Sequence, residues 1–130
     1  MRRVTKEWLD FSEMDLRAAE HLLTMWPIPR EIICYHCHQS AEKALKGVLA
    51  ENDVEPPKTH NLTRLCGMCE QFIPEFADLK ETCGKLAPYA AQLRYPERPE
   101  VTEETMKLAL KYSHDILDFA LSVLEEGTEA

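Results

Sequence analysis

The sequence has no long apolar run, few glycines and no internal repeat. Only 4 glycines occur among 130 residues, and the 8 prolines fall in a few short stretches. Long segments therefore remain without a helix-breaking residue, which favours helices over a sheet rich in turns. Because no apolar segment reaches the roughly 18 residues that a membrane span requires, a transmembrane helix is excluded.

The sequence predicts neither a secretory signal nor a disulfide framework. Basic residues open the chain at positions 1–6, but the segment that follows is amphipathic, whereas a secretory signal requires an apolar block there. The chain has 5 cysteines, and an odd number without a signal is not typical of a disulfide-linked secreted domain. We therefore expect a protein of the reducing cytoplasm.

The chain is acidic, with 15 Lys and Arg residues against 23 Asp and Glu residues and a formal net charge of -8. An acidic protein repels phosphate backbones on average. The charge therefore argues against a general nucleic-acid coat, but it leaves room for a local basic site that binds RNA or a nucleotide.

Apolar residues recur at helical spacing in several segments that prolines separate. The predicted helices span residues 5–26, 29–51, 59–72, 75–93 and 102–126. Thr59 and Thr102 are the expected N-caps of the third and fifth helices. The pattern predicts an all-α fold, a single domain over residues 1–130 with its core at about 5–126. It is expected to be an up-and-down antiparallel bundle of about five helices.

Three of these helices show a clear apolar face. The face expected on the first helix holds Trp8, Phe11, Ala18, Ala19, Leu22 and Leu23. The face expected on the second holds Ile33, Cys34, Cys37, Ala41, Ala44, Leu45 and Val48. The apolar arc of the last helix is wider, so we expect it to be buried against several neighbours or across a dimer interface.

A polar face on the second helix carries residues that suit a ligand site. His36, Gln39 and Lys43 share one side of the helix because three, four and seven positions separate them. Lys43 supplies positive charge for a phosphate, and the other two side chains can hydrogen-bond a base or ribose. The alternative interpretation is a solvated face with one interhelical network.

Asp15 lies near the apolar face of the first helix, where an unpaired carboxylate is costly. We expect it to accept a hydrogen bond or an ion pair from His36, Lys43 or Arg94. In that position it either locks two helices together or takes part directly in a ligand site.

Two further places are candidates for binding an anion. His60 follows the expected Thr59 cap, and helix N-termini bind anions through their free N–H groups; the alternative is a plain capping role. Arg94 and Tyr95 lie in a proline-rich loop, where an arginine can bind phosphate or carboxylate through two hydrogen bonds or anchor two helices.

The cysteines form two CxxC pairs, Cys34 with Cys37 and Cys66 with Cys69. Four thiolates would suit a structural zinc ion. Both pairs, however, lie on the apolar stripes of helical patterns, where free cysteine packs as a small hydrophobic side chain. We therefore predict core packing for these residues and no metal site.

Four local motifs, in this order along the chain, resemble the HEPN domain of prokaryotes. They are DLRAA at 15–19, CYHCHQSAEKALK at 34–46, THNL at 59–62 and RYP at 94–96. The resemblance covers roughly residues 7–125, and the four motifs together carry it where each alone would be weak.

The resemblance implies an up-and-down helical bundle that forms a homodimer. Many members of this family are encoded beside, or fused to, a small nucleotidyltransferase, and the pair often acts as a toxin–antitoxin system. Several members are ribonucleases that use an Arg, four to six residues and then a His near the last helix. Here His114 lies on the last helix without an Arg at that spacing, and the formal match is Arg30 with His36.

Two hypotheses for the function follow. The favoured one is a binding and regulatory module, not itself an enzyme and without a cofactor. It would take a nucleotide or a nucleotidyltransferase partner through His36, Lys43 and Arg94. The alternative is a metal-independent ribonuclease, in which His36 with Arg30, or else His114, removes the proton of a ribose 2′-OH and arginine stabilises the phosphorane-like charge.

Overall fold

The computed structural model describes residues 1–90 and 100–129, with side chains through residue 125. Within these residues the chain is helical and has no strand. The α-helices are α1 (Arg3–His21), α2 (Arg30–Glu51), α3 (Leu62–Glu70), α4 (Lys80–Leu86) and α5 (Glu103–Glu129). Short 3-10 helices are η1 (Leu22–Thr24), η2 (Pro74–Leu79) and η3 (Ala87–Tyr89). The predicted all-α helical bundle is confirmed.

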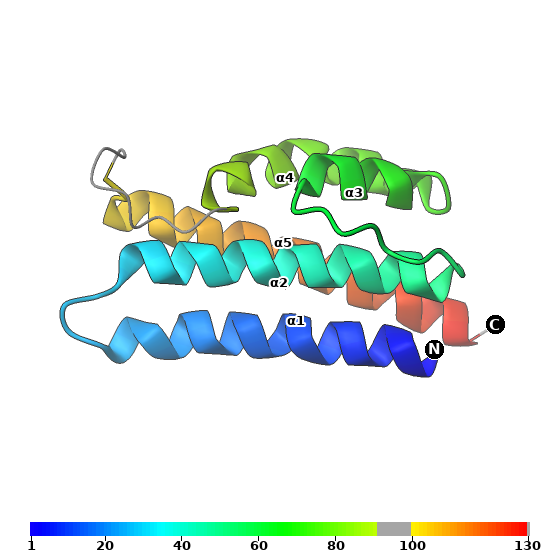
Figure 1. Ribbon diagram of the computed structural model, residues 1–130, viewed down its shortest axis with the longest axis horizontal. Coiled ribbons are helices and arrows are strands. Elements are labelled where there is room, and N and C mark those ends of the chain that lie inside the picture. Colours follow the sequence, from blue (N-terminus) through cyan, green and yellow to red (C-terminus); the bar gives the residue numbers. More distant parts are fainter. Residues whose placement is uncertain (91–99, 130) are drawn as a thin grey trace.

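Helix α2 is the centre of the bundle and contacts each of the other four α-helices. Figure 1 shows α1 and α2 side by side and antiparallel, with α5 running behind α2 and the shorter α3 and α4 covering a further side. Any side chain on α2 therefore faces another element or a narrow strip of solvent between two of them.

Local sequence signals set most of the helix boundaries. Asp53, at φ 61, follows the C-cap of α2 in the left-handed conformation that ends many helices. The predicted cap at Thr102 is confirmed, because its Oγ1 accepts the backbone N–H of Thr105 at 3.1 Å. The cap predicted at Thr59 is wrong. The N-cap is Asn61, whose side chain accepts the backbone N–H of Arg64 at 3.0 Å, and α3 begins at Leu62.

The fourth predicted helix, over residues 75–93, is broken into three pieces. Pro74 opens η2, α4 follows, and Pro88 lies within η3. Pro74 holds the first position of η2, where proline is tolerated. Pro88 lacks the N–H that a helix interior requires, and the α-helix ends before it, at Leu86. Residues 91–93 lie outside the described part of the chain.

The face that α1 buries differs from the one predicted. Phe11 is 61% exposed, whereas α1 packs through Thr5, Leu9, Ser12, Leu16 and Ala19. Helices α1 and α2 approach each other closely, and the Ser12 hydroxyl donates to the carbonyl of Ser40 at 2.7 Å. A Cβ added at Gly47 would lie 3.3 Å from the Cβ of Trp8. Small and hydroxyl-bearing side chains permit this approach, and a hydrophobic-face pattern does not detect them.

The remaining core agrees with the sequence pattern. Every residue of the apolar stripe predicted on α2 is fully buried. Helix α5 packs against α1, α2 and α4, which accounts for its wide apolar arc by contact with several neighbours. Among the described helices, none combines the length and the apolar character that crossing a membrane requires.

Candidate functional site

Asp15 of α1 and two residues of α2 meet between these helices. The Nδ1 atom of His36 lies 2.9 Å from Oδ1 of Asp15, and the ammonium group of Lys43 binds Oδ2 of the same carboxylate. The Asp15 side chain is 13% exposed, so this carboxylate is largely removed from water; Lys43 compensates its charge, and His36 supplies a hydrogen bond. The predicted pairing of Asp15 with His36 and Lys43 is confirmed.

The contact with Asp15 orients the imidazole ring of His36. Because Nδ1 faces a carboxylate, it carries the proton in the neutral ring, and Nε2 is left to accept or, in the charged ring, to donate. Among the described residues, Nε2 has no hydrogen-bond partner. The side chain is 28% exposed, so a molecule at the surface can reach this atom.

Gln39 lies one turn from His36 along α2 and on the same side. Its side chain is half-buried, yet its carboxamide makes no hydrogen bond to any described residue. The donor and acceptor of such an amide can hydrogen-bond a polar ligand without breaking a hydrogen bond to a described residue. We call Asp15, His36, Gln39 and Lys43 together the His36 site.

Aromatic side chains of α1 lie beside two lysines of α2. The Nζ atom of Lys43 is 5.8 Å from the ring centroid of Phe11, and that of Lys46 is 5.7 Å from the ring centroid of Trp8. These distances permit attraction between the ammonium charge and the ring. The antiparallel packing of α1 on α2 places each of these rings beside its lysine.

A second polar cluster lies on the neighbouring strip of α2 and was only partly predicted. Glu42 pairs with Lys46 at 3.1 Å and accepts from Nδ1 of His60 at 2.8 Å. The side chains of Glu42 and Lys46 are 5% and 9% exposed. Nε2 of the fully buried His38 donates to the carbonyl of His60 at 3.1 Å.

The sequence contained a signal for this second cluster. Positions 38, 42 and 46 are four apart, so they form one row along a helix. The pairing with His60 came from a loop that local pattern cannot place. His60 precedes the α3 cap residue and its ring is tied to Glu42, so its imidazole is held against α2 and not at a free helix N-terminus.

The three residues proposed for ribonuclease chemistry occupy different places. Nη1 of Arg30 donates to the carbonyl of Val101 at 3.2 Å, whereas Nε2 of His114 lies 3.1 Å from Glu20. Arg30 and His36 are six residues apart, so they point about 120° away from each other around α2. Within the described chain this arginine therefore makes no contact with either histidine.

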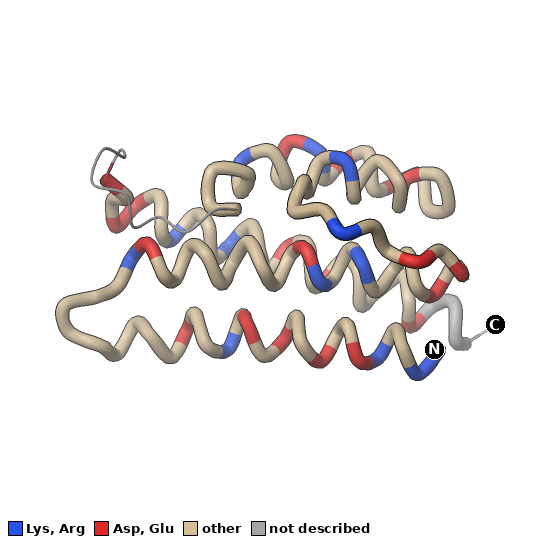
Figure 2. Tube along the Cα trace, viewed as in Figure 1, with Lys and Arg blue, Asp and Glu red and all other residues tan. Residues whose placement is uncertain are grey.

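Arg94 and Tyr95, also proposed to bind a ligand, lie outside the described residues. The basic group that the structure does place at the His36 site is Lys43. Figure 2 shows acidic and basic residues interspersed along the described helices, so none of these helices is basic throughout.

All five cysteines are buried and free of disulfides, as predicted for core packing. Burial raises the pKa of the Cys34 thiol and of the Cys69 thiol to about 12, and that of Cys37 further in the same direction. In the described part of the chain, no three His, Cys, Asp or Glu side chains are arranged to hold a metal ion.

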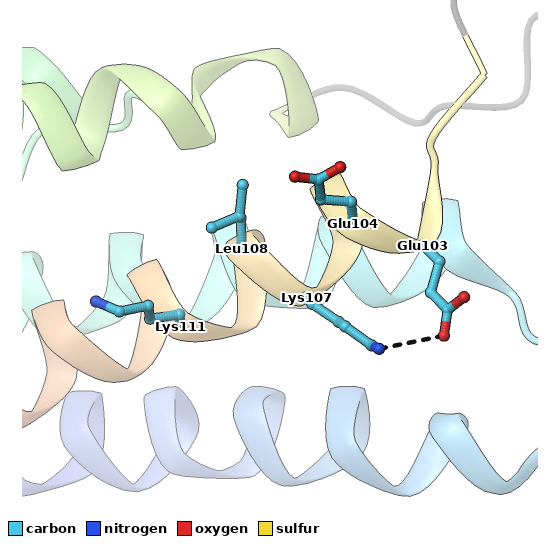
Figure 3. Close-up of a pocket in the computed structure, with 5 residues that line it drawn as sticks. All are labelled: Glu103, Glu104, Lys107, Leu108 and Lys111. Carbon is cyan, nitrogen blue, oxygen red and sulfur yellow. Dashed lines mark ion pairs between the residues drawn. The ribbon is translucent and has the colours of Figure 1, made fainter.

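A shallow pocket lies on the first turns of α5, away from the residues that the sequence singled out. Figure 3 shows Glu103 and Lys107 pointing toward each other, with their charged atoms 3.3 Å apart. Leu108 and Lys111 complete its lining together with Glu104. Lys107 and Lys111 share the pocket lining with Glu103 and Glu104, so the charges of the lysines are balanced and the pocket is not strongly positive.

Comparison with known proteins places this geometry in context. The model of the HEPN domain matches residues 5–124. The structure is similar to that of TT1696 from Thermus thermophilus, with a TM-score of 0.77 and 26% identity over 94% of this chain and 98% of that chain. It shares the fold of ST0689, an archaeal HEPN homologue, with a TM-score of 0.71 and 23% identity, again over 94% of this chain and 98% of that one. No curated protein sequence matches the chain.

Proposed function

Because the chain belongs to the HEPN domain family, we propose that it is a nucleotide-binding regulatory module whose ligand sits at the His36 site. The observation that carries this proposal is the set of unused hydrogen-bonding positions there. Nε2 of His36 and the carboxamide of Gln39 lie on one side of α2 without a partner among the described residues. Both side chains are partly exposed, so a ligand can take these positions in place of water without breaking a hydrogen bond within the described part of the protein.

Each residue of the site has a role that its chemistry supports. Lys43 supplies a positive charge that a phosphate can share with Asp15. His36 accepts a hydrogen bond from a ribose hydroxyl or a base amino group, or donates one to a phosphate when it is protonated. Asp15 positions both side chains, and Gln39 contributes a donor and an acceptor.

We further propose that the protein acts in the cytoplasm as a homodimer beside a small nucleotidyltransferase, in a toxin–antitoxin-like pair. The support is the resemblance of the four sequence motifs to the family. The mass of the purified protein in solution tests the dimer. Co-purification with the product of an adjacent nucleotidyltransferase reading frame tests the partner.

The experiment that tests the nucleotide site is a calorimetric titration of the purified protein with ATP and other nucleotides. The test variant is His36→Ala, Lys43→Ala. The matched control is His114→Ala, Lys107→Ala, which removes the same residue types from α5. Saturable binding that the test variant loses and the control keeps supports the site; a folded wild type that binds no nucleotide refutes it.

The ribonuclease alternative gains no support from the described residues, since Arg30, His36 and His114 each contact a different partner. Incubation of the same preparations with RNA tests it directly. If the wild type cleaves RNA and His36→Ala or His114→Ala abolishes the cleavage, the protein is a ribonuclease and the binding-module proposal is refuted.

A further inference from the structure

Phe11 is a large apolar side chain that the fold leaves in solvent beside the His36 site. It is 61% exposed and precedes Asp15 by one turn on α1, on the same side of the helix. Lys43, which binds Asp15, places its Nζ 5.8 Å from the centre of the Phe11 ring. The ring, the ammonium group and the carboxylate therefore lie next to one another.

The packing of α1 does not account for an aromatic residue at this position. Helix α1 is held on α2 by Leu9, Leu16 and Ala19 and by the hydroxyls of Thr5 and Ser12. Phe11 belongs to none of these contacts, and most of its surface meets solvent. A planar apolar ring next to polar groups with open hydrogen-bonding positions is the arrangement on which nucleobases stack.

We propose that Phe11 is the surface on which the base of the bound nucleotide stacks. This inference rests on the proposed function and specifies it: the ligand is recognised by its base as well as by its phosphates. Lys43 lies between the ring and Asp15, where its charge meets a phosphate. Gln39, whose amide is unused, reads an edge of the stacked base.

The neighbouring aromatic pair does not offer the same surface. Lys46 also lies beside a ring, that of Trp8, but its side chain is 9% exposed and its ammonium is bonded to Glu42. Lys43 is 26% exposed, so its ammonium group can bind a ligand phosphate while it keeps its contact with Asp15. Phe11 with Lys43 is therefore the pair that a nucleotide can reach.

The test compares a ligand with a base and a ligand without one. Wild type and Phe11→Ala are titrated with ATP and with inorganic tripolyphosphate. Because stacking on an aromatic side chain contributes roughly a five- to hundredfold change in affinity per base, Phe11→Ala is expected to weaken ATP binding by that factor. It should leave tripolyphosphate binding unchanged.

Two variants keep the result specific. Phe72→Ala removes another exposed phenylalanine, 45% exposed near the end of α3, and should bind ATP as the wild type does. Phe11→Trp preserves an aromatic surface, so it should retain ATP binding, and its added indole fluorescence should be quenched by ATP and not by tripolyphosphate.

Each other outcome overturns the stacking role. ATP affinity that is unchanged in Phe11→Ala refutes it and leaves the nucleotide site intact, even if the variant changes the mass of the protein in solution. Equal losses for ATP and tripolyphosphate also refute it, because the ring would then act on the phosphates or on the fold. A wild type that binds neither ligand removes the proposed function together with this inference.

Discussion

Nδ1 of His60 lies 2.8 Å from Oε1 of Glu42, and this contact ties the loop before α3 to the centre of α2. The other carboxylate oxygen of Glu42 binds Lys46 at 3.1 Å. With Glu42 at 5% and Lys46 at 9% exposure, the two charges are almost fully removed from water. Neither can lose its partner without leaving an uncompensated charge inside the protein.

The Glu42→Gln variant should therefore be destabilised by about 3 kcal/mol, since it leaves the Lys46 ammonium buried without an anion. Urea unfolding of wild type and variant measures the change. Asp115→Asn, which breaks the exposed pair with Lys111, is the matched control and should leave the midpoint unchanged. Equal stability of Glu42→Gln and wild type would contradict the buried-pair interpretation.

His38 should make the protein less stable in mild acid. Burial lowers its pKa below the usual 6.5, and its Nδ1 has no partner among the described groups. The unfolded chain therefore takes up a proton near pH 6.5 that the folded chain refuses. The stability that His38 contributes is complete above that pH and is lost as the pH falls toward the folded pKa.

Comparison with His38→Gln isolates this contribution, because the two proteins differ at this residue alone. Between about pH 7.5 and about pH 5, the stability of wild type relative to His38→Gln should fall by up to about 1.4 kcal/mol per pH unit below pH 6.5. Parallel pH profiles for the two proteins would show that His38 is protonated as easily in the fold as in the unfolded chain.

Gln39→Ala should separate binding from stability. Because the carboxamide makes no hydrogen bond to a described residue, its removal should change the free energy of unfolding by less than about 0.5 kcal/mol. The same change should weaken ATP binding several-fold. A Gln39→Ala protein with unchanged ATP affinity would remove Gln39 from the site.

Asp15→Asn, by contrast, should lower stability, since it removes the charge that binds Lys43 and orients His36.

Gly47→Ala should destabilise the protein by about 1 kcal/mol even though alanine favours a helix. The new Cβ would lie 3.3 Å from the Cβ of Trp8, which cannot move without shifting α1. Gly84→Ala, in α4, has nothing within 4 Å and should stabilise the chain by up to about 1 kcal/mol. Thermal unfolding of the two variants should show shifts of opposite sign.

The buried thiols of Cys34, Cys37 and Cys69 should react slowly with a thiol-specific reagent while the protein is folded. With the pKa of Cys34 and of Cys69 at about 12, roughly one such thiol in ten thousand is ionised at pH 8, and the thiolate is the reactive form. Denaturation should release all five thiols to rapid reaction. Rapid native labelling at Cys34 would show that the core opens locally.

The fold was predictable because helix periodicity and prolines are local signals. The buried stripe of α2 followed from residue spacing, and the cap at Thr102 followed from a threonine with two glutamates after it. Phe11 was placed on the wrong face because a hydrophobic pattern gives weight to a phenylalanine and none to Ser12. The close approach of α1 to α2 requires small side chains at the contact, and only the three-dimensional packing shows where that approach occurs.

The site was predictable in part for the same reason. His36, Gln39 and Lys43 share a helix, so their convergence follows from spacing, and the cost of an unpaired carboxylate pointed from Asp15 to the same helix. Glu42 and His60 come together through a loop of the chain whose path no local pattern determines. His38 was missed because one histidine in a helical segment gives no sign of its burial.

The first residues of the chain hold the last turn of α2. Arg2 donates to the carbonyl of Ala50 and pairs with Asp53, each at 2.9 Å, and the hydroxyl of Thr5 donates to Glu51 at 2.9 Å. At the opposite end the chain itself joins α1 to α2. A helical hairpin tied at both ends is held more firmly against splaying, so Phe11 and His36 keep their relative positions, and a ligand that bound to both would lose little affinity to ordering them.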